Sequence, residues 1–267
     1  MAEAEAAKSA RRGFEILELF EKLRRPAPVS LIARSLGYPQ SSTSVLLKTL
    51  RELGYLSYDP EERVYAPTMR VALLGAWVQV GNFGRANILE LLSEVHRSTG
   101  ETTILATQNG LQAQYVHVLE TDAPLRLVYK PGTLRPLCRV AAGLAILAQY
   151  DDATISRLVR NINATAATPE EREDVRAVLR EVARTRRDGH AYKANGVVLG
   201  MGSVALRLPV TDGFGNALVA SVSAPVGRLR ERRKEIVAAL RRAVSLYCWP
   251  TSASARHEQW RDARSKR

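Results

Sequence analysis

Residues 30–67, SLIARSLGYPQSSTSVLLKTLRELGYLSYDPEERVYAP, decide the fold of the N-terminal part of the chain. We expect a short helix that is capped by Ser30 and ends at Gly37, because a serine before an apolar run and a glycine after it mark the two ends of a helix. A second helix follows, with Ser41 or Ser42 as its cap. It continues through Glu52 and carries the apolar stripe Val45, Leu46, Thr49, Leu50 and Leu53.

Segments on both sides of this stretch complete a larger pattern. Residues 10–24 predict an amphipathic helix. Its apolar face contains Phe14, Leu17 and Phe20. Two short β-like runs, 55–58 and 63–66, are separated by Asp59-Pro60-Glu61-Glu62, which is a turn sequence. Three helices followed by a β-hairpin predict a winged helix-turn-helix over residues 1–67.

The second helix of a helix-turn-helix pair enters the major groove of DNA. Hydroxyl groups and free backbone N–H groups at its N-terminus bind phosphates, and the amide of Gln40 can pair with adenine through two hydrogen bonds. The alternative is a winged helix that serves protein contacts, in which the serines act only as caps and turns. The candidate DNA contacts are Arg11, Arg12, Ser30, Gln40, Ser41, Ser42, Thr43, Ser44 and Lys48 on the helices, and Arg63 and Tyr65 on the wing.

The rest of the chain divides into a linker helix at 68–86, a second domain at 87–250 and a polar basic tail at 251–267. Asn109-Gly110 between two alternating apolar runs is a strong hairpin signal. The expected strands are 102–108, 112–120, 125–130, 203–210 and 217–225, and the expected helices are 138–149, 151–160, 169–187 and 228–248. This order predicts an α+β domain with antiparallel strand pairs and helices packed against the sheet.

Composition excludes several classes of protein. Of the 267 residues, 46% are hydrophobic and 25% are charged, which is typical of globular domains. No apolar run approaches the roughly 18–20 residues of a membrane span, and the N-terminus carries no apolar signal segment. Two cysteines provide neither a disulfide framework nor a zinc site. We therefore expect a cytoplasmic protein that does not engage a membrane.

The formal net charge of +12 is unevenly distributed. Residues 1–80 contain 11 Lys/Arg and 9 Asp/Glu, a net charge of +2, and residues 81–267 contain 28 and 18, a net charge of +10. A basic excess usually indicates an acidic partner, most often nucleic acid. Here most of the excess lies outside the predicted DNA-reading part, so the charge alone does not locate the interface.

The chain resembles the IclR family of bacterial transcriptional regulators. Residues 30–67 match the family's helix-turn-helix and wing, and three later stretches follow its effector domain in order. These stretches are GETTILATQNGLQAQYVHVLETDAPLRLVYKPGTLRPL (100–137), VAAGLAILA (140–148) and LRLPVTDGFGNALVASVSAPVGRL (206–229). The resemblance implies a winged helix, a linker helix and a GAF-like sensor domain. It also implies a homodimer or dimer of dimers that binds a double-stranded operator and senses a small organic acid, either aromatic or short-chain.

The recognition helix departs from the family pattern at three positions. Gln40 stands where relatives usually carry a basic residue, Ser44 where they carry an aromatic residue or histidine, and Val45 where they carry arginine. Lys48 matches a basic position of the family. The operator sequence of relatives therefore does not transfer to this chain.

A pocket for a small acid needs a few convergent donors in an apolar cleft, together with hydrogen bonds or a cation that offset the desolvation of the carboxylate. The resemblance places this pocket between the sheet and the Ala-rich helix, whose first N–H groups can meet an anion. Ser221 and Ser223 alternate along the last strand and so share a face; a solvated face is their alternative role. The positions that match the family's pocket are Leu127, Ala141, Ala142, Asn195, Ser203, Ala205, Ser221 and Ser223.

Four neighbouring residues are further candidates for this pocket. Arg139 can pair with a ligand carboxylate or lie on the surface, and Tyr129, Cys138 and Met201 can line the pocket or belong to the core.

An enzyme would need groups that the sequence does not contain. There is no Gly-x-Ser-x-Gly elbow and no Walker loop, and the four histidines have no metal-ligand spacing. We expect no enzyme activity, no cofactor and no metal. The remaining alternative to a regulator is a GAF-like ligand-binding module without DNA output.

Overall fold

The computed structural model describes residues 2–74, 87–212 and 215–248. The chain forms two compact units, Met1–Gln79 and Val80–Arg267, which we call the N-terminal and C-terminal units. Each is described by itself. Most of the predicted linker at 68–86 lies outside the described residues. Its described part contains a helix at residues 69–74. The predicted tail at 251–267 lies wholly outside the described residues.

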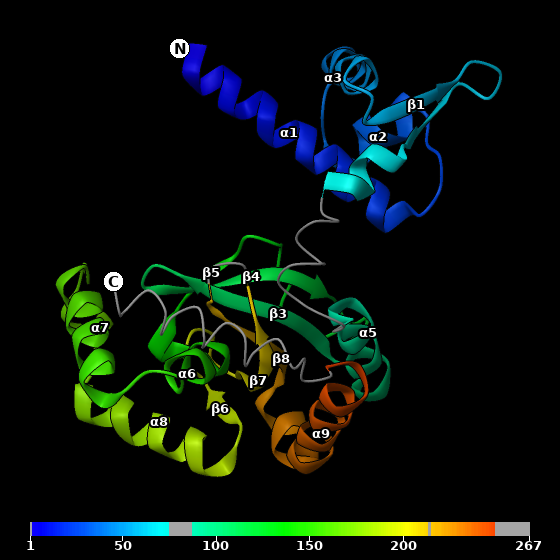
Figure 1. The fold of residues 1–267 in the computed structure, drawn as a ribbon. Helices are drawn as coiled ribbons and strands as arrows, with labels where there is room; N and C mark the ends of the chain where they lie inside the picture. The colour runs from blue at the N-terminus through cyan, green and yellow to red at the C-terminus, as the bar shows by residue number, and fades with distance from the viewer. Residues whose placement is uncertain (1, 75–86, 213–214, 249–267) are drawn as a thin grey trace, which may run out of the picture. The chain divides into compact units, whose positions relative to one another are not determined.

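Up to residue 67, the N-terminal unit consists of three helices and a hairpin, as predicted (Figure 1). These elements are α1 (Ala2–Leu23), α2 (Val29–Leu36), α3 (Gln40–Glu52), β1 (Leu56–Asp59) and β2 (Val64–Pro67). Gly37 ends α2 in a left-handed conformation (φ 69°), which glycine adopts without steric cost. The elements share one core of Ile16, Phe20, Ala27, Ile32, Leu47, Leu56 and Tyr65.

The serines predicted to cap α2 and α3 are not the N-cap residues of these helices. Pro28 and Pro39 occupy the N-cap positions, and Ser30 and Ser41 lie inside the helices. A proline has no N–H to offer a helix interior, so each helix begins directly after it. Ser42 is also no cap, since its hydroxyl donates to the Pro39 carbonyl (3.0 Å).

The predicted apolar face of α1, on which Ile16 lies beside Phe14, Leu17 and Phe20, differs from the structure only at Phe14. Phe14 is 68% exposed, whereas Ile16 and Phe20 are buried. On α3, Val45 and Leu53 are exposed, whereas Leu47 is fully buried. Periodicity located both helices but set the buried face of α3 a fraction of a turn away from its true position.

The wing follows the predicted turn chemistry. β1 and β2 pair antiparallel, and the Asp59 carboxylate accepts the backbone N–H groups of Glu61 and Glu62 at 2.9 and 3.2 Å. Tyr65 and Ala27 exchange two backbone hydrogen bonds, which fasten the wing to the chain between α1 and α2.

The C-terminal unit is built on one six-stranded sheet of order β5-β4-β3-β8-β7-β6, in which all neighbours are antiparallel. The strands are β3 (Thr102–Asn109), β4 (Gln112–Leu119), β5 (Leu134–Pro136), β6 (Ala191–Ala194), β7 (Met201–Thr211) and β8 (Ala217–Pro225). The helices are α5 (Ile88–Thr99), α6 (Ala141–Leu147), α7 (Asp152–Ala164), α8 (Val175–Asp188) and α9 (Val226–Tyr247), with short 3-10 turns at Leu137–Arg139 and Pro169–Glu171.

Helices cover both faces of this sheet (Figure 1). Ile104, Ala205 and Val219 pack with α6, α7 and α8, whereas the alternate residues Leu105 and Val222 pack with α5 and α9. The predicted α+β architecture with antiparallel pairs and packed helices is confirmed.

Residues 125–130, predicted as a strand, form none. Leu127 and Tyr129 turn inward and Val128 is 64% exposed, so the alternation that suggested a strand is real. The short strand β5 pairs with residues 112–114 of β4, and the 125–130 segment pairs with no strand. The sequence also missed β6 and placed the starts of α6 and α8 too early, because a 3-10 turn precedes each helix.

Candidate functional site

The recognition helix presents a polar N-terminal half. Gln40, Ser41 and Lys48 are exposed on α3, and Ser44 is half-buried. Arg63 is exposed at the tip of the wing, where it holds a positive φ of 55°. The first turn of α3 has no side-chain cap, so its N–H groups are available to an anion.

Two predicted DNA contacts, Thr43 and Tyr65, are buried in the structure. Thr43 is fully buried and donates to the Pro39 carbonyl (3.0 Å), so it serves the core of the unit. Tyr65 is 4% exposed and packs against the Tyr58 ring with centroids 4.7 Å apart. Along β2 the alternation places Tyr65 inward, and neither side chain can reach a duplex.

The arginines of α1 differ in their surroundings. Arg11 is exposed, whereas the Arg12 guanidinium lies 4.6 Å from the centre of the Tyr38 ring. Tyr38 lies in the turn between α2 and α3 and donates a hydrogen bond to Glu15. Arg12 therefore braces the turn of the helix-turn-helix through a cation–π contact.

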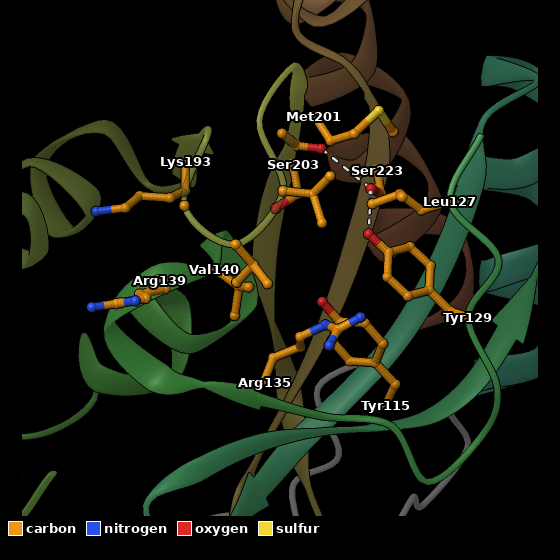
Figure 2. Close-up of a pocket in the computed structure, with 14 residues that line it drawn as sticks. Tyr115, Leu127, Tyr129, Arg135, Arg139, Val140, Lys193, Met201, Ser203 and Ser223 are labelled. Carbon is orange, nitrogen blue, oxygen red and sulfur yellow. Dashed lines mark hydrogen bonds between the residues drawn. The ribbon is translucent and has the colours of Figure 1, made fainter. Parts of the chain in front are cut away.

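The C-terminal unit contains a cleft between the α6 side of the sheet, the 125–130 segment and the loop at 195–200 (Figure 2). Its cavity volume is only about 30 Å³, so the surrounding side chains nearly fill it. The residues that line it are Tyr115, Leu127, Tyr129, Arg135, Arg139, Val140, Lys193, Gly196, Val197, Val198, Met201, Gly202, Ser203 and Ser223.

Arg135 supplies a positive charge at this cleft. Its half-buried guanidinium lies 5.6 Å from the centre of the Tyr129 ring, and its positive charge lowers the pKa of the nearby Tyr115 hydroxyl against the larger effect of burial. Within the described ranges no carboxylate lies within 4.0 Å of it. Burial raises the pKa of Tyr115 well above its usual value, so this phenol stays protonated and neutral at pH 7.

Hydroxyl groups form the opposite wall. Tyr129 and Ser223 share a hydrogen bond (3.2 Å), and Ser223 also lies 3.3 Å from the Gly202 carbonyl (Figure 2). Ser203 accepts the backbone N–H of Ala141 at the start of α6 (3.4 Å). The two tyrosine rings meet edge to face with their centroids 5.2 Å apart.

The other two cations at the cleft are already paired. Arg139 binds Glu173 (2.5 Å) and the Glu170 carbonyl (2.8 Å), and Lys193 binds Glu181 (2.6 Å). Figure 2 shows their charged ends directed away from Tyr129. Arg139 and Lys193 therefore hold α8 and the segment before it. Of the three cations that line the cleft, Arg135 is the one that lies beside the tyrosines.

The 195–200 loop closes one side of the cleft at very short range. A Cβ at Gly196 would lie 1.9 Å from the Arg139 carbonyl oxygen, so only glycine permits this approach. Asn195 holds a positive φ of 58° and accepts the Gly200 N–H through its side chain (2.8 Å). Asn195 therefore shapes the loop and does not line the cleft.

Half of the predicted effector positions lie elsewhere than the cleft wall. Cys138, Ala141, Ala142, Ala205 and Ser221 are buried and pack in the core or within the sheet. The Ser221 hydroxyl bonds to the Val204 carbonyl (3.2 Å), so neither a ligand clamp nor a solvated face describes it. Six predicted positions do line the cleft: Leu127, Tyr129, Arg139, Met201, Ser203 and Ser223.

Sequence reasoning missed Tyr115, Arg135 and Lys193. Tyr115 and Arg135 come from β4 and β5, strands that pair in the sheet, and no local motif marks either residue. Their signal was an arginine just before the buried turn at 137–139 and a tyrosine on the inward face of β4.

Two kinds of feature are absent from the described ranges. No group of three or more His, Cys, Asp or Glu side chains is placed there to hold a metal ion. None of the helices there is long and apolar enough to cross a membrane.

Comparison with protein families assigns the chain. The IclR helix-turn-helix domain matches residues 9–60, and the C-terminal domain of bacterial transcriptional regulator IclR matches residues 85–249. The second match alone covers more than half of the chain. The chain belongs to the IclR family of bacterial transcriptional regulators. DNA binding and transcription regulation are thus the activities of its family.

Individual relatives agree with this assignment. The chain is 29% identical over 240 residues to the HTH-type transcriptional repressor AllR of Salmonella typhi, covering 85% of this chain and 83% of AllR. It is 28% identical over 199 residues to the HTH-type transcriptional regulator XynR of Escherichia coli K12, covering 74% of this chain and 79% of XynR.

Solved structures of the family share the fold. The Thermotoga maritima IclR matches 90% of this chain and 96% of its own, with 22% identity and a TM-score of 0.54. The effector domain of the IclR regulator from Acinetobacter sp. ADP1 covers 61% of this chain and 95% of its own, with 24% identity and a TM-score of 0.57.

Proposed function

We propose that this IclR-family regulator senses a small organic acid in the cleft of its C-terminal unit and changes its operator affinity in response. The observation that carries the proposal is Arg135. This half-buried cation has two tyrosines for neighbours and no carboxylate within ion-pair distance among the described residues. A carboxylate that binds beside it would gain a charge-assisted hydrogen bond in a partly desolvated place.

The remaining walls support a particular size and shape of acid. Leu127, Val140 and Met201 offer apolar surface, and Ser203 and Ser223 offer hydroxyls on the far side from Arg135. We infer a compact acid, aromatic or short-chain, with a hydroxyl or carbonyl group opposite its carboxylate. Because the cavity volume is only about 30 Å³, we expect the surrounding side chains to move apart when the acid binds.

A thermal-shift screen of aromatic, hydroxy and keto acids tests this proposal. An acid that binds only the folded state raises the melting temperature. Arg135→Met should abolish the shift, and Lys130→Met, an exposed cation of the same region, should preserve it. If Arg135→Met responds as the wild type does, the proposed anchor is wrong.

For DNA we propose that the exposed side chains of α3 read the operator. Gln40 reads a base, Lys48 and the first N–H groups of α3 contact phosphates, and Arg11 and Arg63 contact the flanking backbone. Gel shifts with operator-length DNA test this directly. Gln40→Ala and Lys48→Ala should weaken binding, whereas Lys22→Ala, which removes an exposed cation at the end of α1, should not.

The same gel shift separates the regulator from its alternative. A ligand-binding module whose winged helix serves protein contacts would bind acids but no operator. We further propose that two or four copies assemble and that the acid alters the spacing of paired winged helices through the linker, since half-site spacing is a geometric property of the dimer. An acid that binds without changing DNA affinity would refute this coupling.

A further inference from the structure

Val45 occupies an unexpected place on the recognition helix. It lies in the middle of α3, and 64% of its side chain is exposed. The residues that pack α3 onto the unit are Leu46, Leu47 and Leu50. Val45 is therefore outside the core that fixes this helix.

The neighbours of Val45 define the surface to which it belongs. Ser41, Val45 and Lys48 follow one another at spacings of four and three residues, so they share one face of α3. Ser41 and Lys48 are both exposed. An apolar side chain thus stands between a hydroxyl and an ammonium on the face that a helix-turn-helix presents to the major groove.

Helix stability does not explain a valine at this position. A branched Cβ restricts side-chain freedom in a helix, so valine is a poorer helix former than alanine, lysine or glutamine. An exposed valine also gains little from packing within its own chain. The neighbouring Thr49 hydroxyl donates its only proton to the Val45 carbonyl (3.1 Å), so in this structure it has no proton left to donate to a base.

We propose that Val45 is a specificity-determining residue that contacts the C5 methyl group of a thymine in the operator. The thymine methyl is the apolar group that base pairs present in the major groove, and an aliphatic side chain is its complement. The proposal rests on the proposed DNA-reading role of α3. It adds that an A·T pair is selected there by apolar contact, between the base read by Gln40 and the phosphate bound by Lys48.

The test begins with selection of a preferred site from random duplexes by the full-length chain. Each thymine of that site is then replaced in turn by deoxyuracil, which removes only the methyl group. At one thymine of the half-site we expect about fourfold weaker binding, the effect of one buried methyl group. In Val45→Ser the same replacement should have no effect. Leu53→Ser, which alters an exposed apolar residue at the other end of α3, should keep the wild-type response.

The outcomes separate this inference from the proposed function. A selected site at which no deoxyuracil weakens binding, or at which it weakens wild type and Val45→Ser equally, overturns the thymine contact and leaves DNA reading in place. Failure to select any sequence overturns both. Because the deoxyuracil series changes only the DNA, the result with the wild-type chain does not depend on how the variant folds.

Discussion

Gly143 gives the most direct test of how the C-terminal unit is packed. It lies within α6, all seven residues of which are buried. A Cβ added at Gly143 would lie 2.0 Å from the Leu137 carbonyl oxygen and 2.6 Å from the carbonyl carbon. We predict that Gly143→Ala destabilises this unit, although alanine is the better helix former.

The magnitude follows from two opposing effects. Glycine to alanine in a helix interior favours folding by up to about 1 kcal/mol. Overpacking a buried site costs about 1–3 kcal/mol, and here the obstacle is backbone, which cannot rotate away. The helix or the turn at Leu137 would have to move by about 1 Å to restore an ordinary contact. We expect a net loss of about 2 kcal/mol, which lowers the melting temperature by roughly 4–8 °C.

Calorimetry of the full chain measures this change, and Gly13→Ala provides the matched control. Gly13 also lies in a helix, α1, but nothing lies within 4 Å of the position of its missing Cβ. The control should raise the stability of the N-terminal unit by up to about 1 kcal/mol. A Gly143→Ala protein that melts at or above the wild-type temperature would refute the packing argument.

Three further predictions concern single groups of the C-terminal unit. Gly196→Ala should weaken the binding of any acid found in the screen by about tenfold, because a new Cβ 1.9 Å from the Arg139 carbonyl oxygen displaces the loop. The affinity of the unliganded protein for DNA should stay unchanged. Titration calorimetry measures the acid affinity and gel shifts measure the DNA affinity, and an unchanged acid affinity would contradict the prediction. Burial raises the pKa of Cys138 to about 12, whereas an unfolded thiol has a pKa near 9. The unfolded chain therefore loses this proton first, and the unfolding free energy should fall as the pH rises from about 9 towards 12. Cys138→Ala should flatten that decline. Glu101→Gln should change the unfolding free energy at pH 7 by less than about 1 kcal/mol. Burial raises the pKa of this carboxyl, and the cost of burying its charge offsets the gain from its ion pair with Arg228 (3.0 Å). A loss of about 3 kcal/mol in urea denaturation would show that the ion pair outweighs the cost of burial.

Local chemistry explains why much of the fold could be predicted. Gly37 and Gly110 adopt positive φ angles that few other residues tolerate, so they mark a helix end and a hairpin in any context. The Asp59 carboxylate closes the wing turn with its own neighbours. Such signals need no information about distant parts of the chain, and they gave the order of the elements.

The faces of the elements were harder to predict than the elements themselves. Thr43 can be buried because the Pro39 carbonyl, one helical turn earlier, accepts its proton. Tyr65 is buried because Tyr58 and the strand bridge to Ala27 surround it. Both side chains carry a hydroxyl group, and only their neighbours in space reveal that they belong to the core.

The cleft was the least predictable feature because it is assembled from distant segments. Tyr115 and Arg135 meet only after β4 pairs with β5, and Tyr129 joins them from a segment that forms no strand. The family resemblance pointed to this region, and Ser223, one of the positions it suggested, lines the cleft. It gave no indication of Arg135.

The net charge of the C-terminal unit can now be interpreted from its ion pairs. Arg228 holds the buried Glu101, Arg139 holds Glu173 and Lys193 holds Glu181, and each pair joins segments that are distant in sequence. These three pairs clamp elements of the unit together. Each pair is neutral as a whole, so the net charge of the unit is carried by its other cations, of which Arg135 is one that lies at the cleft.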